Sequence, residues 1–333
     1  MLFYPVAFDK SDKDAILPAT RSDLTRQHRR TCKTSHCGAL PSRFRRERVL
    51  LVGCGDVGMR VAGLLRGRVA LLALTSSAGH VAELRASGIR PLLGNLDDAP
   101  SIRRLAGLAT RLVHLVPPAG HDAGDRRTLV LTRALRQRPP PKSLVYGSTS
   151  GVYGDCDGQI AIETRATSAD TARARRRIDA ETMIRRLGRA SNLVCSILRI
   201  PGIYASDRAG GTPHARLKKG TPVLDAIDDV FTNHIHADDL ARACVAALWR
   251  GRPGRVYNVN DDTCLKMGDY FDLAADLYGL PKPPRITRRV ATATLPALQL
   301  SFMSESRRMN NHRMKTELRL RLRYPTVMAG LRD

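Results

Sequence analysis

Three glycines at a fixed spacing are the strongest chemical signal in this sequence. The aliphatic run 49–52 leads into Gly-Cys-Gly-Asp-Val-Gly, and a helical apolar pattern follows. In such a strand-turn-helix unit, the glycines permit a tight turn, close approach of a pyrophosphate to the backbone, and close packing of helix on strand. The N–H groups at the helix start then bind the pyrophosphate. The predicted dinucleotide contacts are Gly53, Gly55, Asp56, Val57 and Gly58.

The residues about 20 positions further on bear on the choice of cofactor. NAD-selective folds of this kind place an Asp or Glu there for the ribose hydroxyls. Here residues 74–77 read Leu-Thr-Ser-Ser, and no carboxylate occurs between Asp56 and Glu83. Thr75 and Ser76 offer hydroxyls to a 2′-phosphate, but no Arg stands beside them. The sequence favours NADP slightly over NAD and leaves both open.

The elements that must position this turn alternate between strands and helices. Aliphatic and β-branched runs predict strands at 48–53, 69–75, 90–93, 111–116, 143–148, 193–199 and 255–259. Helical periodicity predicts helices at 56–66, 79–87, 98–107, 122–138, 171–189 and 237–250. Regular strand-helix alternation implies parallel strands joined by crossover helices on both faces. The expected fold class is α/β, a doubly wound parallel Rossmann sheet.

The same pattern predicts three parts of the chain. Residues 1–46 show no sustained apolar period and are rich in basic residues, so we expect a disordered basic extension. Residues 47–205 form the predicted Rossmann domain. Residues 206–333 are less regular and richer in Pro and Gly, which predicts a smaller substrate-side region at the carboxyl edge of the sheet, with the strand near 255–259 returning to the sheet.

Four further segments resemble one family. Residues 145–154 read Val-Tyr-Gly-Ser-Thr-Ser-Gly-Val-Tyr-Gly and are similar to the Ser-Ser/Thr-x-x-Val-Tyr-Gly signature of extended short-chain dehydrogenases/reductases. Residues 198–204, 233–241 and 255–259 are similar, in order and spacing, to later motifs of the NAD-dependent epimerase/dehydratase family. The tail 301–331 resembles that of an atypical subgroup. The resemblance implies an NAD(P)-binding protein and an oxidoreductase or epimerase.

The resemblance also shows a departure at the expected active site. The family uses a Tyr as proton donor or acceptor, a Lys four residues later and a Ser or Thr. Aligned on Glu181, the Tyr and Lys places hold Arg173 and Arg177, and Thr149 keeps the Ser/Thr place. An Arg side chain, with a pKa above about 12, stays protonated and is a poor general acid or base. Arg177 remains able to hold the ribose, and both guanidinium groups favour an anionic ligand.

A substitute acid or base must therefore come from elsewhere if the protein is an enzyme. Tyr153 and Tyr204 lie near the cleft by analogy, and His234 and His236 precede Asp238. A His beside a carboxylate can titrate near neutral pH, but a residue at a helix start is equally often a cap. We expect Tyr153 and His236 among the catalytic residues, with Thr149, Arg173 and Arg177. The expected substrate contacts are Arg173, Tyr204, Asn233 and His234.

The resemblance implies further cofactor contacts and a quaternary arrangement. The remaining expected contacts are Thr75, Ser76, Asn95, Leu96, Val116, Pro117, Ser148, Arg177, Pro201 and Ile203. A homodimer through helices 122–138 and 171–189 is also implied, although the dense Arg on both opposes it.

The formal net charge of +24 raises the question of a nucleic-acid partner. Nine of the 55 basic residues are Lys and the rest are Arg, spread along the whole chain, and aromatic residues make up only 5%. Stacking platforms for single strands are therefore scarce, and nucleic acid is an improbable main partner. The sequence also lacks an apolar run long enough to span a bilayer, so we expect no membrane partner.

The seven cysteines have no paired spacing, which fits a reducing cytoplasm. His28, Cys32, His36 and Cys37 match no common zinc motif, and no metal is expected.

Two functions stay open from the sequence. The first is an NAD(P)-dependent oxidoreductase or epimerase-like enzyme on a small polar substrate, anionic or nucleotide-linked. The second is a non-catalytic NAD(P)-binding sensor or regulator that lost the proton relay. A nucleic-acid-associated protein is a weaker third reading.

Overall fold

The computed structural model describes residues 47–120 and 123–332. The predicted extension 1–46 and its cluster of His and Cys residues lie outside the described residues.

A seven-stranded parallel sheet is the centre of the fold, in the order β12-β7-β5-β4-β1-β2-β3. The strands are β1 (Arg48–Val52), β2 (Ala70–Thr75), β3 (Arg90–Leu93), β4 (Arg111–His114), β5 (Ser143–Thr149), β7 (Val194–Ile200) and β12 (Arg255–Asn258). All seven predicted strands are confirmed. The order reverses direction at β1 and β4, which is where ligands bind in open sheets of this kind.

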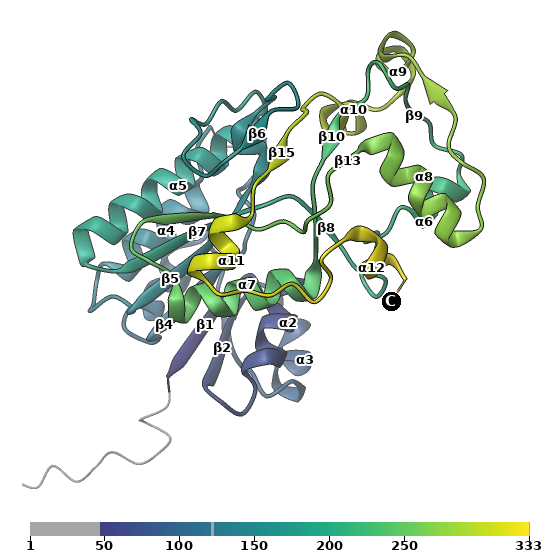
Figure 1. The fold of residues 1–333 in the computed structure, drawn as a ribbon. Helices are drawn as coiled ribbons and strands as arrows, with labels where there is room; N and C mark the ends of the chain where they lie inside the picture. The colour runs from purple at the N-terminus through teal and green to yellow at the C-terminus, as the bar shows by residue number, and fades with distance from the viewer. Residues whose placement is uncertain (1–46, 121–122, 333) are drawn as a thin grey trace, which may run out of the picture. The chain divides into compact units, whose positions relative to one another are not determined.

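Helices cover both faces of this sheet (Figure 1). They include α2 (Asp56–Leu65), α3 (His80–Ala86), α4 (Arg126–Leu135), α5 (Ala172–Ser191) and α7 (Ala237–Arg250). Along β1, Val49 and Leu51 belong to the apolar cluster with α2 and α7, whereas Leu50 and Val52 belong to the cluster with α4 and α5. Side chains alternate between the two faces of a strand, so a strand covered on both faces must be apolar throughout.

Two predicted elements differ from the structure. The helix expected at 98–107 is a 3₁₀ helix, η1 (Ala99–Leu105), with a proline in its first turn. The strand expected at 111–116 ends at His114, although the Leu115 N–H still donates to the Val52 carbonyl. Pro117 and Pro118 follow and have no N–H to continue the ladder.

A third apolar cluster lies beyond the carboxyl end of the sheet. It joins α6 (His214–Lys218), α8 (Met267–Tyr278), α9 (Arg288–Thr294), α10 (Ala297–Met303) and α12 (Val327–Leu331). Figure 1 shows α8, α9 and α10 grouped apart from the strands of the main sheet. Except for the strand near 255–259, the sequence predicted no element after residue 250.

Short strand pairs connect the two parts. The pairs are β8 (Gly202–Tyr204) with β11 (His234–His236), β9 (Val223–Leu224) with β14 (Arg285–Ile286), β10 (Phe231–Thr232) with β13 (Leu265–Lys266), and β6 (Ile160–Ala161) with β15 (Arg308–Met309). The helix α11 (His312–Glu317) then returns to β12. The division of the chain at residue 205 stays a prediction.

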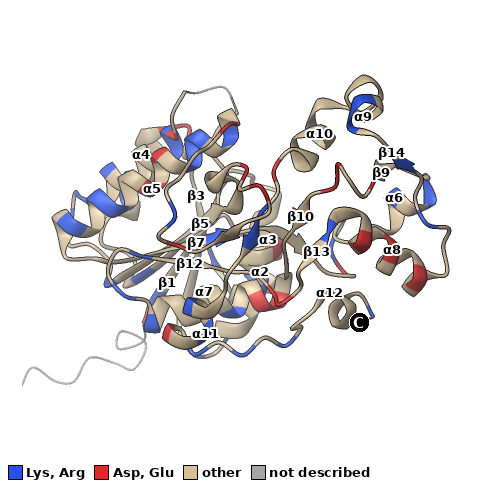
Figure 2. Cartoon of the chain, turned by 45° about the horizontal axis from the view of Figure 1, so that its top comes forward, with Lys and Arg blue, Asp and Glu red and all other residues tan. Residues whose placement is uncertain are grey.

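Basic residues gather on the outer surface of α4 and α5, as Figure 2 shows. Acidic residues are prominent on α8, which carries Asp269, Asp272 and Asp276. None of the described helices has the length and apolar character that crossing a lipid bilayer requires.

A buried ion pair fixes α5 on the sheet. The Arg199 guanidinium on β7 donates two hydrogen bonds to the Glu181 carboxylate on α5, at 2.9 and 3.1 Å. The Ser148 hydroxyl on β5 donates to the same carboxylate at 2.7 Å. Both charged side chains are almost fully buried. Burying either charge alone would be strongly destabilising, and each side chain neutralises the charge of the other.

We predict that Arg199→Met destabilises the protein strongly, because it leaves the Glu181 carboxylate buried without this cation. The expected loss is about 3 kcal/mol of unfolding free energy, measured by urea denaturation. Arg186→Met, at an exposed position of α5, is the control and should change the unfolding free energy by less than about 0.5 kcal/mol. Equal losses in the two variants would contradict the importance of the pair.

Candidate functional site

The glycine turn at the carboxyl end of β1 has the geometry of a ligand cradle. Gly53 has φ +98°, and a Cβ there would lie 2.8 Å from the Val116 nitrogen. A Cβ on Gly58 would lie 2.5 Å from the Gly53 carbonyl oxygen. A Cβ on Gly55, at the N-cap of α2, would meet no heavy atom within 4 Å. Two glycines are thus required by packing, and the third leaves open space at a helix N-terminus, where a pyrophosphate fits.

Charged residues tie this turn to the loop that follows β8. The Asp56 carboxylate accepts hydrogen bonds from Arg60 and from Arg208, the latter at 2.5 Å. Arg60 also donates to Asp207 and to Asp238 on α7. The two guanidinium groups neutralise Asp56, which would otherwise repel a phosphate at the start of α2.

The other predicted cofactor contacts have different environments. Thr75 ends β2, and its hydroxyl lies 3.2 Å from both the backbone nitrogen and oxygen of Ser77, whereas Ser76 is exposed. The Asn95 side chain accepts from the Asp97 N–H, and Leu96 is buried in the core. Leu96 therefore contributes packing rather than an exposed side chain.

Two predicted contacts follow the fourth strand, and one ends the fifth. Val116 is half-buried against the turn, and Pro117 is exposed beyond it, with its carbonyl accepting from Arg127. Ser148 is buried, and its hydroxyl donates to Glu181. This hydroxyl therefore serves the buried ion pair, and the role of Ser148 as a cofactor contact stays a prediction.

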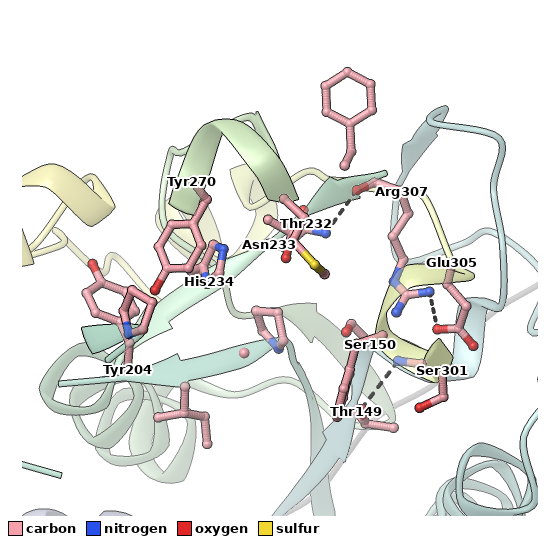
Figure 3. A pocket seen from close by; sticks show the side chains of 18 of the residues that line it. Thr149, Ser150, Tyr204, Thr232, Asn233, His234, Tyr270, Ser301, Glu305 and Arg307 are labelled. Carbon is pink, nitrogen blue, oxygen red and sulfur yellow. Dashed lines mark hydrogen bonds and ion pairs between the residues drawn. The ribbon is translucent and has the colours of Figure 1, made fainter. Parts of the chain in front are cut away.

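A pocket of about 850 Å³ lies beside this end of the sheet. Its walls come from the end of β5, the start of α5, β8, α6, the β10–β11 segment, α8, α10 and the segment that ends at Arg307. Figure 3 shows Thr149 and Ser150 near one side of the pocket, and Tyr270, His234 and Tyr204 near another. The predicted residues that line it are Thr149, Arg173, Pro201, Ile203, Tyr204, Asn233 and His234.

The two arginines at the family's Tyr and Lys places have different environments. Arg173 is exposed at the pocket wall. Arg177, one turn further along α5, donates to the Gly147 carbonyl at 2.7 Å and to the Tyr146 hydroxyl at 3.0 Å. Its guanidinium therefore braces β5, and it does not line the pocket.

Two side chains that the sequence predicts to be catalytic make hydrogen bonds that stabilise the fold. Tyr153 is fully buried, its hydroxyl donates to the Asn258 side chain at 2.7 Å, and Arg199 lies over its ring. His236 accepts the Asp238 N–H as the N-cap of α7, and its ring packs on Tyr324. Burial lowers the pKa of His236 from its usual value. Neither residue lines the pocket, and their assignment as catalytic stays a prediction.

Several pocket residues escaped the sequence analysis. Arg208 and Arg216 come from the segment after β8, and Tyr270 comes from α8. Glu305 and Arg307 form an ion pair at 2.7 Å within the pocket wall, drawn in Figure 3. The only sequence signal for Glu305 and Arg307 was the tail motif Ser-Glu-Ser-Arg-Arg at 304–308. This motif is part of the family resemblance, which implies no function for it.

The buried carboxyl group of Asp261 lies next to the Tyr204 hydroxyl. The Tyr204 hydroxyl lies 3.3 Å from Asp261 Oδ2, and Asp261 Oδ1 accepts the Thr263 N–H. Burial raises the pKa of Asp261 to about 7. Burial also raises the pKa of Tyr204 above its usual value, so this phenol stays protonated near neutral pH.

Among the residues that the structure describes, no group of three or more His, Cys, Asp or Glu side chains is arranged to hold a metal ion.

The parallel sheet, the glycine turn at its switch point and the adjoining pocket define a Rossmann-type dinucleotide-fold protein. The model of the NAD-dependent epimerase/dehydratase family matches residues 123–260. A structure from Silicibacter pomeroyi, described as a functionally unknown conserved protein, is 31% identical, with a TM-score of 0.73 over 86% of this chain and 96% of that chain. The chain belongs to the NAD-dependent epimerase/dehydratase family.

More distant solved structures share the fold. UDP-glucose 4-epimerase from Thermotoga maritima, solved with UDP-glucose, is 18% identical with a TM-score of 0.70, over 86% of this chain and 96% of that chain. The UDP-glucose 4-epimerase from Thermus thermophilus, solved with NAD, is 20% identical with a TM-score of 0.67 over the same shares. A comparison with functionally curated proteins gives no match.

We predict that Asp261 contributes a part of the unfolding free energy that falls as pH rises from 5 to 8, opposite in sign to the contribution of the buried His234, whose pKa is lowered. Its pKa is higher in the folded than in the unfolded state, so the folded protein holds the extra proton, and the resulting stability is lost as pH rises through about 7. Relative to wild type, Asp261→Asn should therefore lose more unfolding free energy at pH 5 than at pH 8, as measured by urea denaturation at each pH. Asp262→Asn, at the adjacent exposed residue, is the control. A wild-type slope that persists in Asp261→Asn would contradict the assignment.

Proposed function

We propose that this protein binds NAD(P) and acts as an oxidoreductase or epimerase on a small polar or nucleotide-linked substrate. The observation that carries the proposal is the open backbone at Gly55, which lies at the N-terminus of α2 beside a pocket large enough for a substrate. A bound nicotinamide would accept or return a hydride. The protein must then hold the substrate oxygen and move its proton.

Residues of the pocket provide groups for these tasks. Thr149 ends β5, and its hydroxyl is placed to hold a substrate oxygen, while the charge of Arg173 attracts an anionic substrate. Arg177 has further N–H donors for a ribose hydroxyl beyond those it directs to β5. A guanidinium group is a poor general base. The Glu305 carboxylate is the group in the pocket wall that we assign as proton acceptor.

The choice of cofactor is best decided by experiment. The structures from relatives that name a cofactor name NAD, and the slight preference for NADP drawn from residues 74–77 has no support from them. Ser76 is exposed, but the Thr75 hydroxyl is directed to its own turn. A thermal-shift titration with NAD, NADH, NADP and NADPH separates the two, because a ligand that binds only the folded state raises its apparent stability.

A non-catalytic NAD(P) sensor or regulator is the second candidate. Two features favour it. Arg173 and Arg177 stand in place of the Tyr and Lys that transfer the proton in the family, and the side chains of Tyr153 and His236 are hydrogen-bonded within the fold. A cytoplasmic location and a homodimer are kept as parts of the proposal for either function.

We predict that Gly55→Asp weakens NAD(P) binding at least about tenfold without unfolding the protein. The new side chain occupies the open space and places a negative charge where the pyrophosphate binds. Gly63→Asp, at an exposed glycine with equal space further along α2, is the matched control and should bind normally. Unchanged affinity in Gly55→Asp would show that the dinucleotide binds elsewhere.

We predict that Glu305→Gln and Thr149→Val each lower substrate-dependent NAD(P)H turnover by at least about a hundredfold. The assay follows nicotinamide absorbance with a panel of polar alcohols and nucleotide sugars. Glu83→Gln, at an exposed helix position, should retain full activity. Intact cofactor binding without turnover on any member of the panel would favour the sensor.

A further inference from the structure

The wall of the pocket formed by α6 and α8 contains an arginine without a counter-charge. The Arg216 guanidinium on α6 lies over the Phe271 ring, with its central carbon 4.4 Å from the ring centre. Its Nη2 atom is buried and donates no hydrogen bond, and no described carboxylate forms an ion pair with this residue. Burial lowers the pKa of Arg216 from its usual value.

Two further donors beside this arginine are also unused. The His234 ring stacks on the Tyr270 ring with centroids 4.1 Å apart, and its Nε2 atom is buried without a partner. Burial lowers the pKa of His234 to about 4, so the imidazole is neutral near pH 7. The Tyr270 hydroxyl makes no hydrogen bond to a described residue, and Tyr270 packs edge-on against Phe271. All four residues line the same pocket.

Unused donors at a buried wall need a partner from outside the chain. An unsatisfied buried polar group is destabilising, and native proteins satisfy nearly all such groups with protein, water or ligand. A guanidinium fork on an aromatic ring, beside a phenol and an imidazole, matches an oxyanion that accepts several hydrogen bonds.

The other arginines that line the pocket are less suited to bind an oxyanion. Arg208 is paired with Asp56, and Arg307 is paired with Glu305. Arg173 is exposed to solvent, so its charge is screened.

We propose that Arg216, Tyr270 and His234 form a subsite for a terminal oxyanion of the substrate, a carboxylate or a phosphate. This inference rests on the proposed function, because it takes the pocket to be the substrate site. Thr149 lines the same pocket from the end of β5, whereas Arg216 and Tyr270 line it from α6 and α8. A substrate bound in this way has its anionic end at α6 and its reacting carbon toward the end of β5.

The test is calorimetric titration of the full-length protein with inorganic phosphate and, separately, with malonate, with and without saturating NAD. Arg216→Gln should weaken binding of at least one probe about tenfold or more, because it removes the charged fork. Lys218→Gln is the matched control, since it removes one charge from an exposed position of the same helix, and should change affinity less than about twofold. The probe with the larger dependence on Arg216 identifies the oxyanion as phosphate or carboxylate.

Tyr270→Phe provides a second measurement that removes only the hydroxyl, should Arg216→Gln fail to fold. It should weaken the same probe about threefold or more. Equal binding by wild type, Arg216→Gln and Tyr270→Phe would overturn the subsite, as would phosphate binding that is lost in Gly55→Asp and kept in Arg216→Gln.

The same titrations separate this subsite from the proposed function. Arg216→Gln should bind NAD with unchanged affinity, because Arg216 lies outside the glycine turn. If wild type binds phosphate through Arg216 but binds no dinucleotide, the proposed function fails and the subsite stands. If NAD binds but neither probe depends on Arg216, the subsite fails alone.

Discussion

The placement of the candidate site depends on the buried ion pair between Glu181 and Arg199. It joins α5 to β7 and, through Ser148, to β5, so three elements share one fully desolvated interaction. A buried pair of this kind tolerates little displacement, because moving Glu181 leaves the Arg199 charge uncompensated in the interior, and moving Arg199 leaves the Glu181 carboxylate with only the partly exposed Arg185 as its cation. The end of β5, which carries Thr149, and the start of α5, which carries Arg173, are thereby held beside one another at the same edge of the sheet.

The glycine turn and the pocket are coupled by a second set of charges. Arg60 and Arg208 connect the start of α2 with the loop after β8 and with α7. These pairs are partly exposed and individually weak, but they share partners and so form one network. The chain that lines the pocket is thus joined to the turn that we propose for the dinucleotide, and a ligand at either place meets the same loop.

Arginine side chains have several different roles in this protein, and the surroundings of each side chain determine its role. Arg199 is an internal counter-ion, Arg177 braces a strand through neutral acceptors, and Arg216 faces the pocket without a carboxylate. We propose that Arg173 and Arg177 replace the family's Tyr-Lys relay, whereas the sheet, the pocket and the hydroxyl of Thr149 are kept. Such an arrangement suits electrostatic recognition of an anion, and it requires proton transfer to come from a group outside the family's usual place.

The sequence by itself determined the strands of the sheet, their parallel direction and the glycine turn, because these depend on local patterns. Strands covered on both faces must be continuously apolar, and a turn with positive φ at Gly53 favours glycine. The tertiary structure alone decided which polar side chains reach the pocket. Tyr153 and His236 stand in the expected motifs but serve as a core residue and a helix cap, whereas Arg216, Tyr270 and Glu305 come from segments far apart in sequence in which the sequence predicted no element. Their convergence arises from packing around α6 and α8, and no local spacing of residues encodes a contact made across more than 50 positions.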